Sequence, residues 1–325
     1  MHGKRVLVSG AAGFIGRWSV PALLRLGYEV HAVLSGNTSR EVPAQLDGAR
    51  IHFADLLDET RIDALTSEVR PSHLLHFAWI ATPGVYWSSA DNFRWLAASE
   101  RLVRSFHAQG GSRIVMAGSC AEYDWSRVEV CDELSSPLAN DAASPYAACK
   151  IALQKTLGDF GRREQLSTAW GRIFFQFGPY EHPDRLVPSV ICNLLLNREA
   201  PCSHGRQIRS FLHVADVGEA FAAVLDSELE GPVNIGSGER VALADLVDRI
   251  GRHIGRPELL RLGARPAPAQ EPSLLVPEIH RLRDQAGWRP RFTLNEALSD
   301  TIAWWRGRLL ARNDTGHAAT RGTHE

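Results

Sequence analysis

The sequence lacks the features that would assign it to one of several special classes of protein. Its 36 Lys and Arg residues stand against 37 Asp and Glu residues, so the net charge of -1 gives no electrostatic reason to expect nucleic acid or an anionic membrane as a partner. No apolar run approaches the ~18 residues of a membrane-spanning helix. The N-terminal residues also lack the long hydrophobic core of a signal peptide.

Cysteine is scarce as well. Five cysteines lie scattered through 325 residues without a C-x-x-C pair, so the sequence predicts neither a disulfide framework nor a metal site. We therefore expect reduced thiols and a cytoplasmic protein. What the chain does contain is 44% apolar and 22% charged residues, the composition of an ordinary globular protein that can bury a sizeable core.

A glycine-rich turn follows the first apolar run. Residues 6–8 have the pattern of a short strand, residues 10–16 follow as Gly-x-x-Gly-x-x-Gly, and residues 19–26 have helical periodicity. This order places bare backbone N–H groups and a helix N-terminus beneath a pyrophosphate, although such glycines also occur in simple turns. The sequence therefore predicts a dinucleotide site with contacts from Gly10, Gly13, Phe14, Ile15 and Gly16.

The ends of the next two strands bear on which dinucleotide is bound. An acid after residues 29–34 would bind the ribose 2′-hydroxyl of NAD, and none is present. Ser35, Asn37 and Arg40 instead offer groups that accept a 2′-phosphate, so NADP (NADPH) is the preferred cofactor and NAD the alternative. After the third strand, Asp55 and Leu56 stand where an adenine edge is contacted; a cap for the next helix is the other interpretation.

Strands and helices alternate through the first half of the chain. Strands are predicted at 51–56, 73–77, 112–116 and 168–174, with helices at 92–107 and 146–162 between them. This order predicts an α/β fold with a doubly wound parallel sheet, Rossmann-like, in which ligands bind at the carboxyl ends of the strands. We expect a dinucleotide-binding domain at 1–178 with some later segments returning to it, mainly a smaller C-terminal α/β substrate-binding lobe at 179–311, and a disordered tail at 312–325.

Tyrosine and lysine stand four residues apart at the start of one predicted helix. On that helix Tyr146 and Lys150 share one face, so both can address a single bound molecule. A neighbouring ammonium favours the phenolate and lowers a tyrosine pKa toward neutrality, where the proton can be passed either way. Taken alone, the pair also fits an ordinary helix surface.

Five motifs in order resemble those of a known family. They are the glycine turn, Asp55-Leu56, His76-Phe77-Ala78-Trp79, Ser119 and Tyr146-x-x-x-Lys150, and motifs in the second half of the chain also fit. Together they are similar to the extended short-chain dehydrogenase/reductases, and more narrowly to the NAD(P)-dependent nucleotide-sugar epimerase/dehydratase family.

The resemblance implies a triad of Ser119, Tyr146 and Lys150. Tyr146 would exchange the proton of a carbinol oxygen, Ser119 would hydrogen-bond that oxygen, and Lys150 would hold the nicotinamide ribose and lower the tyrosine pKa. The resemblance also implies further cofactor contacts, which are Phe77, Ala78, Trp79, Tyr146 and Lys150.

The resemblance leaves the reaction open. Dehydratases of the family carry an Asp-Glu pair directly after the triad Ser or Thr, and those positions here hold Cys120 and Ala121, with Glu122 one position late, so a dehydratase is disfavoured. The missing acid after the second strand favours an NADPH-dependent 4-ketoreductase of a nucleotide-linked 4-keto-6-deoxysugar. An NAD-dependent nucleotide-sugar 4-epimerase is the alternative, and a non-catalytic dinucleotide-binding interaction protein is the third.

A nucleotide-diphosphate sugar is thus the expected substrate. Arg209 and Arg185 match positions that grip its diphosphate, and ordinary surface positions are the other interpretation. Tyr123 and Trp79 border the predicted cleft, where core packing is equally compatible, and Gln176 stands where many relatives have Asn. The full set expected to contact substrate is Ser119, Cys120, Tyr123, Gln176, Arg185, Val187 and Arg209.

Two further expectations concern histidines and assembly. His76 and His213 are expected to be hydrogen-bonded structural residues, because the triad leaves no role for a histidine. The helices at 92–107 and 146–162 match those that pair across a dimer axis in the family, so a homodimer is expected.

Overall fold

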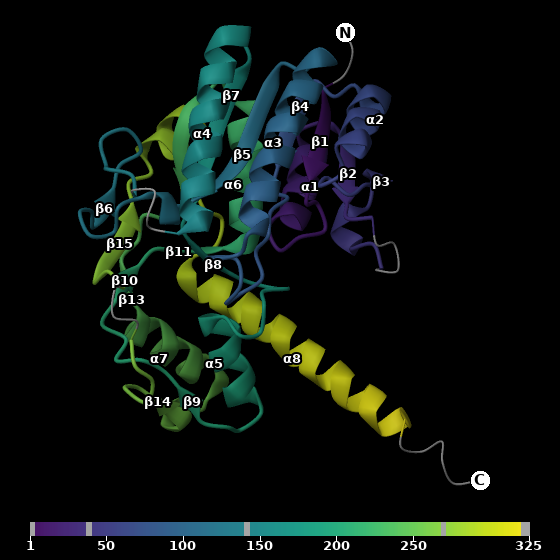
Figure 1. Cartoon of the computed structure of the whole chain (residues 1–325). Helices are drawn as coiled ribbons and strands as arrows, with labels where there is room; N and C mark the ends of the chain where they lie inside the picture. The colour runs from purple at the N-terminus through teal and green to yellow at the C-terminus, as the bar shows by residue number, and fades with distance from the viewer. Residues whose placement is uncertain (1–3, 37–40, 140–143, 268–270, 320–325) are drawn as a thin grey trace.

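A parallel sheet of seven strands runs through the larger part of the molecule (Figure 1). The computed structural model describes residues 4–36, 41–139, 144–267 and 271–319, with 312–319 described by backbone alone. The strand order is β12-β7-β5-β4-β1-β2-β3, and each neighbouring pair is parallel. The strands are β1 (Arg5–Ser9), β2 (Glu29–Leu34), β3 (Arg50–Phe53), β4 (His73–His76), β5 (Arg113–Ser119), β7 (Ser167–Ile173) and β12 (Gly231–Ile235).

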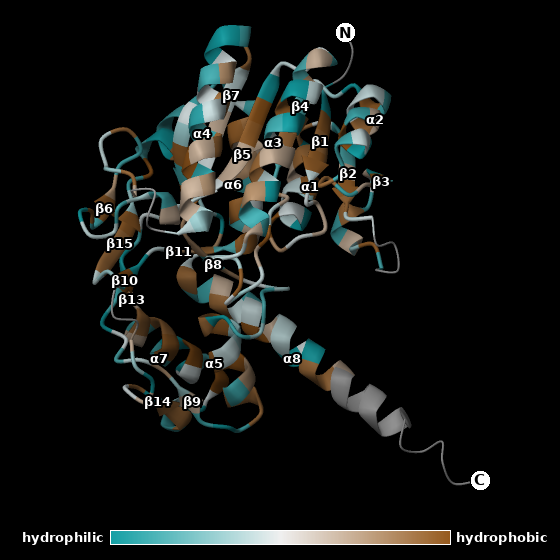
Figure 2. Cartoon of the chain, viewed as in Figure 1, coloured by the Kyte–Doolittle hydropathy of each residue, from teal (hydrophilic) through white to brown (hydrophobic). Residues whose placement is uncertain are grey.

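Helices cover both faces of this sheet because its strands are apolar on both sides. On β1, Val6 and Val8 face one helical layer and Leu7 faces the other, and all three are buried. The strands are correspondingly brown in Figure 2. This arrangement confirms the predicted doubly wound α/β fold. One layer is α1 (Gly16–Arg25) and α6 (Val214–Asp226); the other is α2 (Glu59–Val69), α3 (Asp91–Ala108) and α4 (Pro145–Glu164).

A smaller lobe with its own apolar core lies beyond the carboxyl ends of the strands (Figure 1). Its core joins α5 (Leu186–Leu195), α7 (Leu243–Ile254) and α8 (Leu294–Ala319). A four-stranded sheet, β13-β10-β15-β6, stands beside it. The remaining strands are β6 (Val130–Cys131), β8 (Phe175–Phe177), β9 (Ala200–Pro201), β10 (Ile208–Arg209), β11 (Phe211–His213), β13 (Val241–Ala242), β14 (Leu260–Arg261) and β15 (Leu274–Pro277).

The second half of the chain departs from the predicted boundaries in two places. Strand β12 and helix α6 both follow residue 179 yet complete the large sheet, as expected of segments that return to it. Helix α8 continues to Ala319, so the expectation of a tail from residue 312 is wrong up to that point. Once a helix has formed, each added residue gains a hydrogen bond without a new nucleation cost. Residues 320–325 lie outside the described part.

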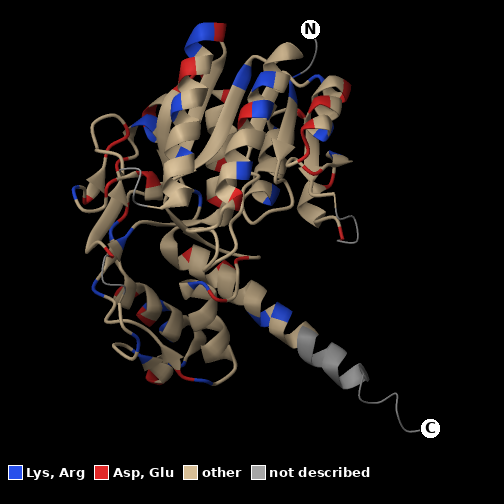
Figure 3. Ribbon diagram, in the orientation of Figure 1, with Lys and Arg blue, Asp and Glu red and all other residues tan. Residues whose placement is uncertain are grey.

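Charges of both signs are interspersed on the outer helices (Figure 3). Among the residues described, no helix combines the length and the apolarity needed to cross a bilayer. Within the same residues, no three His, Cys, Asp or Glu side chains are grouped so that they could hold a metal ion. Any ligand of one charge must therefore be recognised by a local group of side chains or backbone dipoles.

Candidate active site

The glycine turn after β1 is packed so closely that side chains are excluded from it. Gly10 has a φ of 65°, and a Cβ on it would lie 2.8 Å from the backbone nitrogen of Ala78. A Cβ on Gly16 would lie 2.3 Å from the carbonyl oxygen of Gly10. Helix α1 begins directly behind Phe14 and Ile15, and no side chain in the described part of the chain caps its start. The turn thus presents bare N–H groups and a helix N-terminus, which together suit a pyrophosphate.

Substitution of Gly16 by alanine tests this turn. Because the added methyl group cannot fit against the carbonyl of Gly10, we expect NAD(P)H affinity to fall by more than about tenfold, the effect of ~1.4 kcal/mol. Quenching of tryptophan fluorescence by NADH and NADPH measures the affinity. Gly307→Ala is the matched control, since a Cβ there meets nothing within 4 Å. Equal affinity in the two variants would contradict the role of the turn.

The predicted 2′-phosphate site lies only partly in the described chain. Ser35 follows β2 and is exposed, whereas Asn37 and Arg40 fall outside the described residues, so the preference for NADP stays a prediction. No acid stands at the end of β2, where Leu34 is followed by Ser35 and Gly36. A Cβ on Gly36 would lie 3.7 Å from the backbone nitrogen of Asp55, so the ends of β2 and β3 are adjacent.

Asp55 and Leu56 follow β3 at the same edge of the sheet. Asp55 is exposed and accepts a hydrogen bond from the backbone N–H of Leu57 (2.9 Å), while Leu56 is buried. Asp58 caps α2 by accepting from the backbone N–H of Thr60 (2.9 Å). The interpretation of Asp55 as the helix cap is therefore wrong, and its carboxylate remains exposed at the strand end, where the adenine edge is predicted.

The end of β4 is joined to the glycine turn through Ser9. The hydroxyl of Ser9 accepts from the backbone N–H groups of Phe77 (3.2 Å) and Ala78 (3.3 Å) and lies 2.6 Å from Nδ1 of His76. The other ring nitrogen of His76 bonds to Ser99, and burial lowers the pKa of His76 to about 3. His76 is therefore a neutral structural residue, as predicted, and His213 likewise bonds to Asp300.

Ser119 and Tyr146 are placed by local capping. Ser119 ends β5 and caps a short 3₁₀ turn, Cys120–Glu122, by accepting from the backbone N–H of Ala121 (3.2 Å). Ser144 caps α4, and Pro145 occupies its first turn, so Tyr146 and Lys150 share one face of that helix. The hydroxyls of Ser119 and Tyr146 hydrogen-bond to each other. All three members of the predicted triad thus gather at the carboxyl end of β5.

The electrostatics of the pair differ from the prediction. Burial raises the pKa of Tyr146, and the hydrogen bond from Ser119 offsets only part of this effect. Burial also lowers the pKa of Lys150 to about 7. Its Nζ donates to the carbonyl of Ala117 (2.8 Å) and lies 3.8 Å from the centroid of the Trp79 ring. The predicted lowering of the tyrosine pKa by a fully charged lysine is therefore wrong here, because Lys150 is too dry to hold its charge firmly.

Sequence reasoning missed an aromatic cluster around Tyr146. The rings of Tyr86 and Trp87 stand edge-on to Tyr146 with centroids 4.9 and 5.6 Å away, and Trp87 contacts Trp125 at 5.9 Å. Trp125 is fixed by donating to the carbonyl of Cys120 (2.9 Å). The high density of aromatic residues between 79 and 95 was the signal that could have revealed this wall.

A buried carboxyl near the wall was also missed. Glu181 is 8% exposed, and its Oε2 has no hydrogen-bond partner among the described residues. Burial raises the pKa of Glu181 to about 8, against a smaller opposing effect of Arg185. Arg185 in turn lies 5.9 Å from the ring of Tyr86. The side chain of Glu181 is therefore largely neutral at pH 7.

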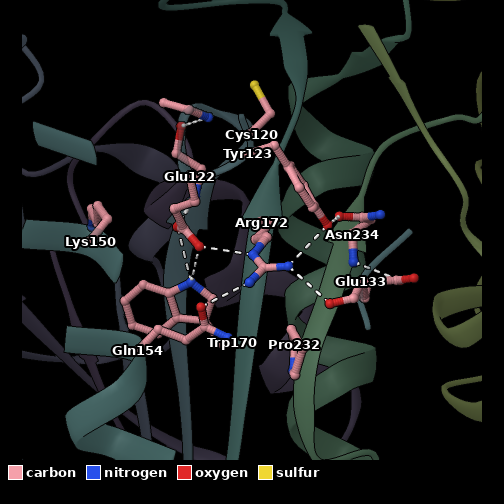
Figure 4. A network of polar contacts seen from close by, with 12 residues as sticks. Cys120, Glu122, Tyr123, Glu133, Lys150, Gln154, Trp170, Arg172, Pro232 and Asn234 are labelled. Atoms are coloured by element: carbon pink, nitrogen blue, oxygen red, sulfur yellow. Dashed lines mark hydrogen bonds and ion pairs between the residues drawn. The ribbon is translucent and has the colours of Figure 1, made fainter. Parts of the chain in front are cut away.

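The position directly after Ser119 holds no usable acid. Burial raises the pKa of Cys120 to about 12, so its thiol keeps its proton at neutral pH. Glu122 is fully buried and turned away from the triad: it pairs with Nε of Arg172 (2.9 Å) and accepts from Nε1 of Trp170 (3.0 Å), as Figure 4 shows. Glu122 also accepts from the backbone N–H of Ser119 (2.7 Å). It therefore acts as a structural anchor for the strand end.

Two predicted substrate residues belong to the core instead. Tyr123 is 1% exposed; its hydroxyl donates to Asn234 (2.7 Å) and accepts from Arg172 (3.0 Å) (Figure 4). The side chain of Val187 is buried in the core of the smaller lobe. The expectation that these side chains contact substrate is wrong, because each lies on the inward face of its element, a property that depends on packing.

The remaining predicted substrate residues lie on the smaller-lobe side of the strand ends. Arg209 is buried, pairs with Glu271 (3.0 Å) and donates to the carbonyl of Pro272 (2.8 Å), while its Nε has no partner among the described residues. Arg185 is exposed at the start of α5. Gln176 is half-buried on β8. Their contact with a substrate stays a prediction.

The chain resembles known enzymes over nearly its whole length. It is 29% identical to a dTDP-glucose 4,6-dehydratase of Streptomyces niveus, with 93% of each chain covered, and 23% identical to a UDP-glucose 4-epimerase of Corynebacterium glutamicum, with 98% of this chain and 99% of that one covered. A solved UDP-glucose 4-epimerase from Thermus thermophilus in complex with NAD is 25% identical, with a TM-score of 0.78 over 93% of this chain and 99% of that one. The model of the NAD dependent epimerase/dehydratase family matches residues 6–236, and the protein therefore belongs to that family.

Proposed function

We propose that the protein transfers hydride at C4 of the hexose of a nucleotide sugar, with NADP or NAD as cofactor. The observation that carries the proposal is the hydrogen bond between Ser119 and Tyr146, with Lys150 one helical turn further on. Bound NAD(P) would supply or accept the hydride. Tyr146 exchanges the proton of the C4 oxygen, and Ser119 donates a hydrogen bond to that oxygen as negative charge develops on it. Lys150 holds a ribose hydroxyl of the cofactor.

The residues present fit such a cofactor. The turn from Gly10 to Gly16 would be filled by any added Cβ, and it leaves the backbone N–H groups in front of α1 for the pyrophosphate. The exposed carboxylate of Asp55 stands beside the turn that follows β2, where the adenosine end belongs. Phe77, Ala78 and Trp79 follow β4 between this turn and Lys150.

The diphosphate of the substrate is assigned to arginines at the smaller lobe. A chain of almost zero net charge must supply these cations locally. Arg209 offers a buried guanidinium whose Nε is still without a partner among the described residues, and Arg185 stands exposed next to Tyr86. Gln176 and Cys120 complete the proposed sugar contacts.

Two reactions share this chemistry, and a different observation favours each. The absence of an acid at the end of β2 favours NADPH and hence a 4-ketoreductase of a nucleotide-linked 4-keto-6-deoxysugar. The similarity to 4-epimerases over nearly the whole chain favours an NAD-dependent nucleotide-sugar 4-epimerase. Dehydration is disfavoured, although dehydratases are among the relatives, because Cys120 keeps its proton and Glu122 is held in the core.

One assay separates these reactions. The purified protein is incubated with dTDP-, UDP-, GDP- and CDP-linked 4-keto-6-deoxyhexoses and NADPH or NADH, while absorbance of the reduced cofactor is followed. Loss of absorbance with NADPH supports the ketoreductase. Interconversion of C4 epimers by protein that retains NAD, with no added cofactor, supports the epimerase. Failure to bind either dinucleotide would contradict both and favour a non-catalytic interaction protein.

The proposal includes the assembly and location expected from the sequence. Helices α3 and α4 pack side by side on one face of the sheet, and Phe93 on α3 is 58% exposed. A homodimer formed through this face would cover that apolar side chain. The cytoplasm, where such substrates and reduced cofactors are available, is the proposed location.

A further inference from the structure

One segment of the chain contacts both Tyr146 and Lys150. It runs from Trp79 to Ser89, between β4 and α3. At its start, the indole face of Trp79 lies against Nζ of Lys150, 3.8 Å from the ring centroid. Near its end, Tyr86 and Trp87 pack against the ring of Tyr146, and the carbonyl of Trp87 accepts from the backbone N–H of Tyr146 (3.3 Å).

A single buried amide joins these two contacts. Asn92 lies in the first turn of α3 and is 0% exposed. Its Oδ1 accepts from Nε1 of Trp79 (2.8 Å), and its Nδ2 donates to the carbonyls of Tyr86 (2.7 Å) and Ser89 (2.9 Å). Both donors and the acceptor of the side chain are thus used within this segment, which is what a buried amide requires to be stable.

We propose that Asn92 and Trp79 are positioning residues for Lys150 and Tyr146: Asn92 fixes the segment, and Trp79 holds the lysine side chain dry against the carbonyl of Ala117. The inference rests on the proposed function only for the catalytic roles of Lys150 and Tyr146. The contact has a physical basis, since an ammonium is attracted to the face of an indole while the ring excludes water from it. A lysine released from this cover would regain water and move away from the cofactor face.

The surroundings of Lys150 explain why its cover matters. The ionisable groups that face it are Glu122 after β5, Cys149 on α4 and His76 on β4. The negative charge of Glu122 raises the pKa of Lys150, and burial lowers it by more, to about 7. Exclusion of water is therefore the dominant influence on the protonation of Lys150, and Trp79 is the side chain that lies directly on its ammonium.

The test measures the protonation of Lys150 without cofactor or substrate. The lysines of the chain are Lys4, Lys150 and Lys155, so protein labelled with ¹³C-lysine gives few Cε signals, which Lys4→Arg and Lys155→Arg variants assign. Following the Lys150 signal against pH gives its titration midpoint. We expect Trp79→Ala to raise the midpoint by at least about one pH unit, toward the ordinary value of 10.5, because water reaches Nζ.

Two further variants complete the experiment. Asn92→Leu keeps the volume but removes the anchor of Trp79, and we expect its midpoint to rise in the same direction. Asn193→Leu is the matched control, since that amide donates to the carbonyl of Ser189 on α5, and its midpoint should equal that of the wild type. An unchanged midpoint in Trp79→Ala would overturn the inference, also where Asn92→Leu fails to fold. Because no turnover is measured, this outcome is distinct from a failure of the proposed function.

Discussion

Replacing Tyr146 with phenylalanine is expected to lower turnover by about 10²- to 10⁴-fold, the usual contribution of one acid–base group, while NAD(P)H affinity stays unchanged. Only the proton-transferring oxygen is lost. The ring retains its contacts with Tyr86 and Trp87, so the start of α4 and the side chain of Lys150 stay in place. Turnover is measured with the substrate that the panel assay identifies, and affinity by tryptophan fluorescence.

The matched control for this variant is Tyr28→Phe. Tyr28 precedes β2 at the amino end of the strands, and its hydroxyl donates to Asp226 (2.9 Å), far from the triad. The control removes a hydrogen-bonded phenol of the same kind, so its turnover should be close to that of the wild type. Tyr146→Phe with wild-type turnover would show that another group transfers the proton and would end the proposed mechanism.

Replacing Arg172 with methionine is expected to lower the free energy of unfolding by about 3–5 kcal/mol. Arg172 and Glu122 have side-chain exposures of 2% and 0%, so the substitution leaves a carboxylate in the core without its cation. The same change removes the donor to Tyr123 (3.0 Å) and to Gln154 (2.9 Å). Urea denaturation followed by tryptophan fluorescence measures the loss, with an unchanged m-value as evidence that the folded state remains compact.

Two variants test whether the unpaired charge causes this loss. Adding Glu122→Gln to Arg172→Met removes the charge while keeping an acceptor for Trp170, and should restore part of the stability. Arg94→Met breaks an exposed pair with Asp91 (2.9 Å) on α3 and should have no measurable effect, because water screens such pairs. If Arg172→Met were as mild as Arg94→Met, the buried network would not anchor the end of β5.

Some features could be predicted because they depend on neighbours along the chain. The spacing of Gly10, Gly13 and Gly16 sets a turn whose geometry is local, and the four-residue spacing of Tyr146 and Lys150 puts both on one helix face. The alternation of apolar strands with helices is likewise a periodic property of the chain, and it yielded the doubly wound sheet. The displacement of Glu122 from the acid position was also predictable, since it follows from counting residues after Ser119.

Other features depend on which strands and loops become neighbours, and the sequence does not state that. The parallel register of β5 and β7 places Gly118 opposite Arg172, and only this pairing brings Glu122 and Arg172 together in the core. The same pairing turned Tyr123 inward, where a cleft position had been expected. Local spacing therefore determined the turn, the helix face and the layered fold, whereas tertiary packing decided which side chains reach the site and how charged they are, because burial and exclusion of water arise only when distant segments meet.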